Sequence, residues 1–564
     1  MLLPLSIIFL TLDYVYMSED TFHEELLVHQ LTSGHVYTQF QFSTLWNVNI
    51  FEEKLPLHFN LFPKSFAEIV SSFGIAELHL SMTQGRWRYN KWGYPILNAP
   101  PGIELWVWFH PDANKTSVDE QWHGLVHALS GQFCSSLNFI NDAVTSSPNL
   151  SMKPLGVWPE KGDSGAHLRY AALSRETVCT ENLTPWKKLL PCTDQAGMGS
   201  LLNALHLYDS SYHSLAIHLR SICETGDCDD VKLELKQTVS SVFDPIHANV
   251  QNNWSLRKLF GRTLNSKCPV ASTSVLIVKL NDENIVTSIL HPPANRNVQN
   301  DDGNFHIYDL LDTDFSKPFD VSASVKYHTK NVITPPYLLV HKYTTGYGEE
   351  VGGSTCTITN SHQRENITIS YFDVVPYFVR TYLHTLRVHV DGKQVNPEAL
   401  RFTPANQRER PTTIEFLLTI PPQSTASVAV EFEKVFLDWM QHPPDAHHGF
   451  YIGSSVISAV YPDTQNSTGI SEQDTLLSRF EAPPNRRVFR RIYTEPLLIR
   501  VPLPDFSMPY NVICLTCTVI AIAFGSIFNL TTRTFEVIDE SSQKTMKDKI
   551  KAFFFKFFKK EKIS

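Results

Sequence analysis

TSVLIVKL, residues Thr273–Leu280, marks the point beyond which the sequence has the pattern of β-strands almost throughout. Its Thr, Val and Ile are residues that favour strands. Further short segments of this kind follow, separated by Pro, Gly and Asn. They are Val321–Tyr327, Tyr337–Tyr343, Cys356–Asn360, Ile367–Tyr371, Tyr382–Val390, Thr413–Ile420 and Ser427–Phe436. Strands at this spacing predict a β-sandwich-like region over residues 271–505.

The chain before this point mixes strands with helices. Ser65 with Glu68, and Ser117 with Glu120, have the spacing of a capping box and predict the start of a helix. The second of these helices is expected to run to about Ile140. The strands are expected at Val36–Ser43, Glu77–Met82 and Gly102–His110. We therefore expect a mainly β fold with some helix, in which residues 18–270 form a mixed α/β region.

The two ends of the chain predict a membrane protein. Residues 1–17 begin with a short apolar run followed by polar sequence, as a signal peptide does, although the run lacks a preceding Lys or Arg. Residues 511–531 are almost free of charge and long enough to cross a hydrocarbon core of about 30 Å. The tail, residues 532–564, is rich in Lys, which marks the cytosolic side. This predicts a type I protein whose bulk is lumenal or extracellular.

Two kinds of short motif agree with this topology. Lys560 and Lys562, close to the last residue, resemble a dilysine signal for retrieval to the endoplasmic reticulum. The candidate N-glycosylation sites are Asn114, Asn149, Asn253, Asn366 and Asn466. Asn182 also begins an N-x-Ser/Thr sequon, but Pro185 follows that sequon and a glycan there would crowd the neighbouring cysteines.

Charge and motifs argue against several function classes. The formal net charge of -9 disfavours a nucleic-acid binder. His23 and His29 lack the spacing of a zinc-binding helix, and the glycines around Gly352 are not followed by the Lys-Ser/Thr of a phosphate loop. No cysteine lies in a recognisable nucleophile motif. We therefore expect no catalytic residue, no metal and no cofactor.

The cysteine count is the most informative feature for function. Of nine cysteines, Cys514 and Cys517 lie in the expected span, which leaves seven outside it. Pairs use cysteines two at a time, so at least one of the seven is free or bonds to another chain. Cys223 and Cys228 are close enough in sequence to close a small loop, and we expect them to pair.

The segment VCTENLTPWKKLLPC, Val178–Cys192, leaves two alternatives open. Cys179 and Cys192 can pair with each other across the turn that contains Trp186, so that some other cysteine stays free. Alternatively, one of these cysteines fastens the chain to a partner. Connectivity does not follow from sequence alone.

Several long strings resemble one known family, the phosphatidylinositol glycan class T (PIG-T) subunits of glycosylphosphatidylinositol (GPI) transamidase. The resemblance extends from about Glu24 to the expected span, and the single span is part of it. The strings are FQFSTLWN, HFNLFPKSF, AELHLSMTQGRWRYNKWG, PPGIELWVWF, VCTENLTPWKKLLPC and SYFDVVPYFVRTYLHTL.

The resemblance implies a non-catalytic subunit of a membrane complex in the endoplasmic reticulum, which attaches GPI anchors to proprotein C-termini. In that family the chemistry belongs to the class K subunit, to which the T subunit is disulfide-linked. The linking cysteine corresponds to Cys179 here. The implied further partners are the class S, class U and GPI attachment factor subunits. Contact with the proprotein or the GPI lipid is left open.

A second hypothesis comes from a different function class. The chain could be a stand-alone lumenal hydrolase or a glycan-binding type I membrane receptor. Its binding surface would then be the aromatic loop around Trp87 and Trp92.

Overall fold

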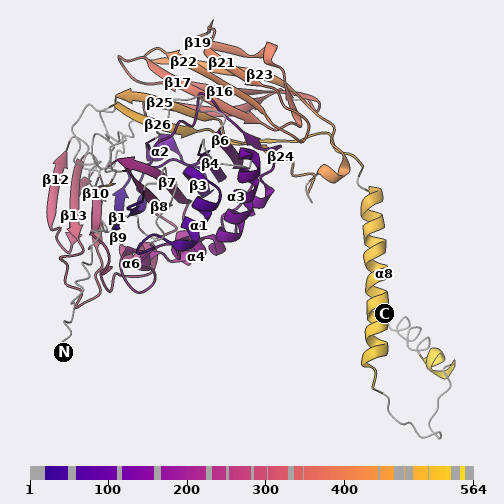
Figure 1. Ribbon diagram of the computed structural model, residues 1–564, viewed down its shortest axis with the longest axis horizontal. Helices are drawn as coiled ribbons and strands as arrows, with labels where there is room; N and C mark the ends of the chain where they lie inside the picture. Colours follow the sequence, from indigo (N-terminus) through magenta and orange to yellow (C-terminus); the bar gives the residue numbers. More distant parts are fainter. Residues whose placement is uncertain are drawn as a thin grey trace, which may run out of the picture. The chain divides into compact units, whose positions relative to one another are not determined.

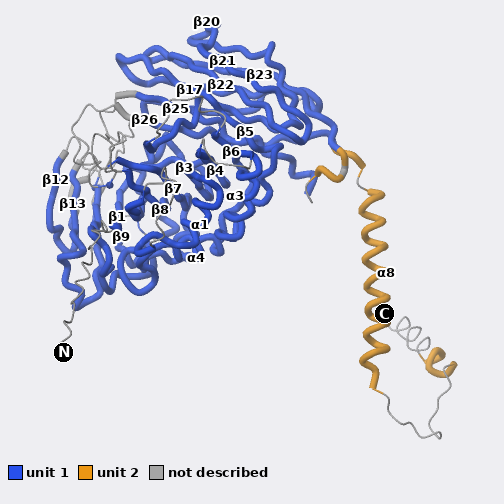
Figure 2. Tube along the Cα trace, viewed as in Figure 1, with its two compact units in different colours: residues 1–437, 443–502 blue, residues 438–442, 503–564 orange. Residues whose placement is uncertain are grey.

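The computed structural model has two compact units (Figure 2). The first comprises Met1–Leu437 and Pro443–Pro502, and the second comprises Asp438–His442 and Leu503–Ser564. The residues that the structure describes are 20–48, 59–110, 117–157, 167–223, 231–248, 250, 253–280, 285–300, 303–327, 336–346, 348–442, 445–462, 475–476, 487–505, 507–534 and 547–552.

A large mixed sheet forms the first part of unit 1 (Figure 1). Among the described residues it has eleven strands, in the order β12-β13-β10-β1-β2-β8-β7-β3-β4-β6-β5. Neighbouring strands are antiparallel, except that β1 and β10 are parallel. The strands are β1 Thr21–Gln30, β2 Val36–Trp46, β3 Ile75–Gln84, β4 Gly102–Phe109, β5 Thr145–Ser146, β6 Leu168–Leu173, β7 Tyr212–Cys223, β8 Val231–Phe243, β10 Thr273–Leu280, β12 Arg296–Asn300 and β13 Gly303–Asp309.

Side chains alternate between the two faces of this sheet, as they must in a strand. On β3, Leu78 and Leu80 belong to the main hydrophobic core, whereas His79 and Ser81 point to the opposite face, which is polar but also buried. The apolar face packs against helices (Figure 1). These and the smaller helices are α1 Lys64–Ser72, α2 Tyr89–Trp92, α3 Val118–Phe133, α4 Thr180–Lys187, α5 Ala204–Leu207 and α6 Leu256–Phe260, with 3-10 turns η1 Ser136–Phe139 and η3 Met198–Leu201.

One of the two capping boxes is confirmed. The Glu120 backbone N–H donates to Ser117 Oγ, and the Ser117 N–H donates to the Glu120 carboxylate at the start of α3. This helix ends at Phe133, short of the expected end, because Cys134 adopts a left-handed conformation with φ 49°. The capping box at Ser65 is wrong. The N-cap of α1 is Pro63, and Ser65 lies inside the helix.

Two further sheets share a core and form the expected sandwich-like part of unit 1. Ile358 and Val428 of one sheet belong to the same buried cluster as Ile369 and Phe416 of the other. The first sheet contains β15 Leu338–Thr345, β16 Val351–Asn360, β18 Val379–Thr381, β19 Arg387–Val390, β20 Lys393–Gln394 and β23 Ser424–Lys434. The second contains β17 Ile367–Val375, β21 Glu398–Thr403, β22 Thr412–Ile420, β25 Val456–Pro462 and β26 Arg487–Tyr493.

Two small sheets complete unit 1 within the described residues. One has the order β11-β14-β9, so the expected sandwich strand at Val321–Tyr327 belongs here instead. The sheets comprise β9 Asn253–Ser255, β11 Ile285–His291 and β14 Ser322–Tyr327, and β24 Phe450–Ile452 with β27 Leu497–Ile499. Because β10 and β13 extend the large sheet, that sheet takes strands from both sides of the domain boundary expected at residue 270.

Unit 2 contains α8, Ser507–Thr532, which includes all of the expected span and is a candidate membrane span. Its 26 residues correspond to a length of roughly 39 Å, more than a hydrocarbon core requires. None of its side chains is buried within unit 2. The expected signal peptide lies outside the described residues, as do Lys560 and Lys562 of the expected retrieval signal.

Candidate functional site

Cys179 lies at the N-cap of α4, and its backbone is held on three sides. Its N–H donates to Asn182 Oδ1 over 2.8 Å, while its carbonyl oxygen accepts from the Asn182 N–H and from the Tyr208 hydroxyl. The Cys179 residue is nevertheless exposed, and among the described residues its thiol has no disulfide partner. The fold thus presents a reactive side chain on a rigid backbone.

Asn182 joins this turn to the end of α3. Its amide Nδ2 donates to the carbonyl oxygens of Phe133 and Cys134, each over 3.0 Å. The side chain is only 4% exposed. A glycan on Nδ2 would require this buried group to reach solvent and lose both bonds, so we infer that the Asn182 sequon is not a glycosylation site. The sequence shows the Cys-x-x-Asn spacing but not the role of the amide.

The remainder of the segment anchors α4 to the sheet. Trp186 is fully buried; its Nε1 donates to the Ala216 carbonyl of β7, and its own carbonyl accepts from Gln237 of β8. Lys187 is also buried, and its Nζ lies 2.6 Å from Asp194 Oδ1. The buried side chains of Trp186 and Lys187 therefore hold the segment against the rest of the fold.

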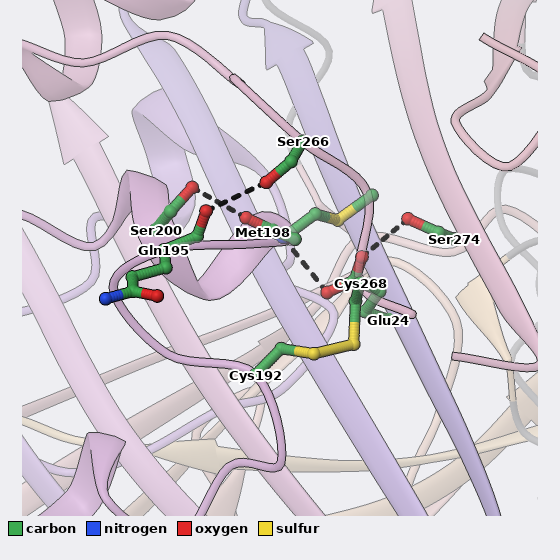
Figure 3. Close-up of a disulfide and its surroundings, with 9 residues drawn as sticks. Glu24, Cys192, Gln195, Met198, Ser200, Ser266, Cys268 and Ser274 are labelled. Atoms are coloured by element: carbon green, nitrogen blue, oxygen red, sulfur yellow. Dashed lines mark hydrogen bonds between the residues drawn. A yellow bond between two sulfur atoms is a disulfide. The ribbon is translucent and has the colours of Figure 1, made fainter. Parts of the chain in front are cut away.

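Cys192 forms a disulfide with Cys268, with 5.9 Å between the Cα atoms (Figure 3). The alternative bridge from Cys179 to Cys192 is thereby excluded. Beside the disulfide lies Glu24, which accepts from the Met198 N–H and the Ser274 hydroxyl. Burial raises the pKa of this carboxyl. At Gly197, with φ 69°, an added Cβ would lie 2.7 Å from both Cys268 Cβ and Glu24 Oε2, so the close packing requires glycine.

The other cysteines of unit 1 fall into three classes. Cys223 is disulfide-bonded, and its partner lies outside the described residues, as does Cys228 of the expected pair. Among the described residues Cys356 is a free thiol buried in the sandwich, where burial raises its pKa. Cys134 is a free, exposed thiol. Its carbonyl oxygen accepts a hydrogen bond from Asn182, whose Oδ1 accepts from the Cys179 N–H.

Exposed apolar side chains occur on the elements around Cys179. Leu205 is 80% exposed on α5, whose C-cap Tyr208 binds the Cys179 carbonyl. Phe139 is 62% exposed on η1, which follows Cys134. Single exposed apolar side chains are common on protein surfaces, so these two residues do not by themselves define a binding surface.

The aromatic loop does not form the binding surface that the second hypothesis requires. Trp87 and Trp92 are 3% and 5% exposed, and both belong to a buried cluster with Tyr212. The prediction that they form a binding surface is wrong, because their rings fill a core. Of the expected glycosylation sites, Asn253 and Asn366 are exposed and Asn149 is half-buried, while Asn114 and Asn466 lie outside the described residues.

Comparisons with known proteins cover almost the whole chain. Residues 6–253 and 244–557 match the family described as "Gpi16 subunit, GPI transamidase component". The chain is 42% identical over 533 residues to the "GPI-anchor transamidase component PIGT" of Homo sapiens, and this match covers 92% of this chain and 91% of that protein. It is 41% identical over 536 residues to the protein of the same name in Mus musculus, at 93% and 91% coverage. The "GPI transamidase component PIG-T homolog" of Schizosaccharomyces pombe is 29% identical over 559 residues, at 92% and 90% coverage. With matches of this extent, the chain belongs to the Gpi16 (PIG-T) family of GPI transamidase components.

Proposed function

We propose that this chain is the non-catalytic scaffold subunit of a GPI transamidase complex and that Cys179 forms a disulfide with the class K catalytic subunit. The observation that carries the proposal is the exposed thiol of Cys179 on a backbone held by Asn182 and Tyr208. Cys192 is already bonded to Cys268 and does not compete for Cys179.

An interchain disulfide at this position stabilises assembly without taking part in the chemistry. Once the bond forms, the remaining contacts between the two subunits become effectively intramolecular, which raises their effective concentration. The rigid turn around Cys179 adds to this effect because little conformational entropy is lost when the partner binds. Losing the bond therefore weakens the complex more than it slows the transamidation step.

The same proposal places the chain in the endoplasmic reticulum membrane with unit 1 in the lumen. A disulfide at Cys179 requires an oxidising compartment, and the bond between Cys192 and Cys268 agrees with one. The α8 helix then crosses the membrane, and the Lys-rich tail is cytosolic. The class S, class U and GPI attachment factor subunits are the further partners in this proposal.

The test is a comparison of non-reducing and reducing gels of the chain from its native membrane. Wild type and Cys134→Ser are expected to give a larger covalent species that disappears with reductant, and Cys179→Ser is expected to lack it. The Cys134→Ser variant is a matched control because it removes the neighbouring exposed thiol. Mass spectrometry of the larger species identifies the second chain.

Two results would contradict the proposal. If wild type runs as a monomer without reductant, the interchain bond is absent, and the scaffold role depends on noncovalent co-purification alone. If the isolated chain turns over a proprotein substrate without a second subunit, the non-catalytic role is refuted.

A further inference from the structure

A cavity of about 170 Å³ lies on the polar face of the large sheet, away from the Cys179 segment. Its floor consists of β3, β7 and β8, where Ser81, Ala216 and Thr238 are aligned across the three strands. These side chains are small, so they leave space above the sheet. Residues 94–99 and strand β26 of the sandwich also line the cavity.

A chain of hydrogen bonds leads from a buried carboxylate to this cavity. Glu77 accepts backbone N–H groups from Leu155 and Gly156, and its Oε1 lies 2.7 Å from His79 Nε2. His79 Nδ1 lies 2.8 Å from His218 Nδ1. The carboxylate acts as an acceptor, so His79 Nε2 is the donor of the first histidine bond.

This order determines the role of the last atom in the chain. Burial lowers the pKa of His79, so the ring is neutral and its Nδ1 accepts from His218 Nδ1–H. Burial and the nearby cations lower the pKa of His218 as well, so its Nε2 carries a lone pair. Within the described residues this shielded Nε2 has no hydrogen-bond partner. The chain therefore ends in an acceptor that needs a donor, such as a hydroxyl group.

Other groups that line the cavity need an acceptor. The guanidinium of Arg491 lies 4.9 Å from the centre of the Trp106 ring, and in the described part of the chain its buried Nε and Nη2 have no hydrogen-bond partner. The same holds for the hydroxyl of Ser81, a residue that is 6% exposed. Buried polar groups are normally paired, so unpaired ones around a cavity indicate a missing polar occupant.

The charges that line the cavity favour an anion. Arg220, Lys236, Arg490 and Arg491 contribute positive charge, but Arg220 and Lys236 both pair with Glu234, at 2.6 and 3.4 Å. Glu104 is the acid among the lining residues that the structure describes, so four cations face two carboxyl groups and the balance stays positive. The planar fork of an arginine matches the oxygens of a phosphate group.

We propose that this cavity binds a small hydroxylated organic phosphate. A hydroxyl of the ligand donates to His218 Nε2, and the phosphate oxygens accept from Arg491. The cavity volume is close to the roughly 150 Å³ of a cavity that holds benzene, and it is smaller than the roughly 300 Å³ at which drug-sized pockets begin. A short polyol with one phosphate, such as glycerol 3-phosphate, matches this scale. The site is independent of the scaffold role and of Cys179.

The test uses the full-length chain in detergent with three probes: glycerol 3-phosphate, inorganic phosphate and glycerol. Isothermal titration of wild type is expected to show that glycerol 3-phosphate binds at least tenfold more tightly than inorganic phosphate and that glycerol does not bind. Thermal unfolding followed by tryptophan fluorescence should then show a rise in Tm of on the order of 3 °C at about one hundred times Kd.

Variants locate the binding in this cavity. Ser81→Val fills the space and Arg491→Lys removes the planar fork, and each is expected to weaken glycerol 3-phosphate binding at least tenfold. His389→Gln, which changes a histidine of β19 outside the cavity, is the matched control and should bind like wild type.

Three outcomes would overturn the proposal. If none of the probes binds wild type, the cavity holds only water. If glycerol 3-phosphate binds no more tightly than inorganic phosphate, the hydroxyl bond to His218 is wrong. If Ser81→Val folds and binds like wild type, the ligand binds elsewhere. The first two measurements use wild type alone, so they decide the question even if a variant fails to fold.

Discussion

Replacing Asn182 by alanine tests whether this side chain holds the Cys179 turn in place. The side chain makes three hydrogen bonds with the backbone, at 2.8, 3.0 and 3.0 Å, and it is buried. Each such bond contributes about 1 kcal/mol net. We therefore expect Asn182→Ala to lower the free energy of unfolding by about 3 kcal/mol.

The loss should also appear in the proposed function. Without Asn182 the Cys179 backbone is no longer tied to the end of α3, and the thiol samples more positions. Urea unfolding of the full-length chain measures stability, and non-reducing gels of native membranes measure the yield of the disulfide-linked species. Both are expected to fall in Asn182→Ala. Asn182→Asp should be at least as destabilising, because a carboxylate would face two carbonyl oxygens that now accept from Nδ2.

A matched control separates this role from glycosylation. Thr184→Ala removes the sequon but leaves the Asn182 amide in place, so it should change neither the stability nor the mass that the protein loses on glycosidase treatment. The reasoning is refuted if Asn182→Ala unfolds within about 0.5 kcal/mol of wild type. It is also refuted if Thr184→Ala loses a glycan, since that would show an Asn182 side chain exposed to solvent.

Three further predictions concern stability. Because the Cys192–Cys268 bond closes a sequence separation of 76 residues, Cys192→Ser combined with Cys268→Ser is expected to destabilise the chain by about 4 kcal/mol in urea unfolding. In the sandwich, Lys342 and Asp373 form a buried pair at 2.8 Å, so Lys342→Met should cost about 3–5 kcal/mol, and Lys342→Met with Asp373→Leu should recover most of it in a double-mutant cycle. Burial alone would raise the pKa of Glu234, but the charges of Lys236 and Arg220 lower it to about 2. The stability that this carboxylate contributes is therefore full above the usual pKa near 4.5 and is lost as pH falls towards 2. Stability measured from pH 6 to pH 2 should therefore fall less steeply in Glu234→Gln than in wild type.

Local sequence patterns located many elements but did not arrange them. The strand expected at Gly102–His110 is β4, Gly102–Phe109, because a run of large apolar residues has few alternatives to a buried strand. The capping box at Ser117 was correct and the one at Ser65 was not. In the second case Pro63 takes the N-cap position in an extended conformation, so the helix begins before Ser65. A capping motif thus predicts a helix start only if no earlier residue provides one.

Sheet membership was beyond the reach of these patterns. Thr273–Leu280 was correctly read as a strand, yet it pairs in parallel with β1, where Thr273 aligns with His23. A hydrophobic pattern indicates which face of a strand is buried, but it does not specify which strand lies alongside. The sequence pattern likewise does not show that the polar side chains of β3, β7 and β8 are covered by another part of the chain. The sandwich covers them and creates the cavity that contains the unpaired His218 and Arg491 atoms.

The cysteines show where sequence alone stops. The sequence determined that the number of cysteines outside the expected span is odd, and the family resemblance pointed to Cys179. Only the tertiary structure decided that Cys192 pairs with Cys268 and that Cys134 lies beside Cys179 through Asn182. The physical reason is that a disulfide requires Cα atoms about 4.4–6.8 Å apart, and distances of this kind between remote residues are set by how the sheet and its helices pack.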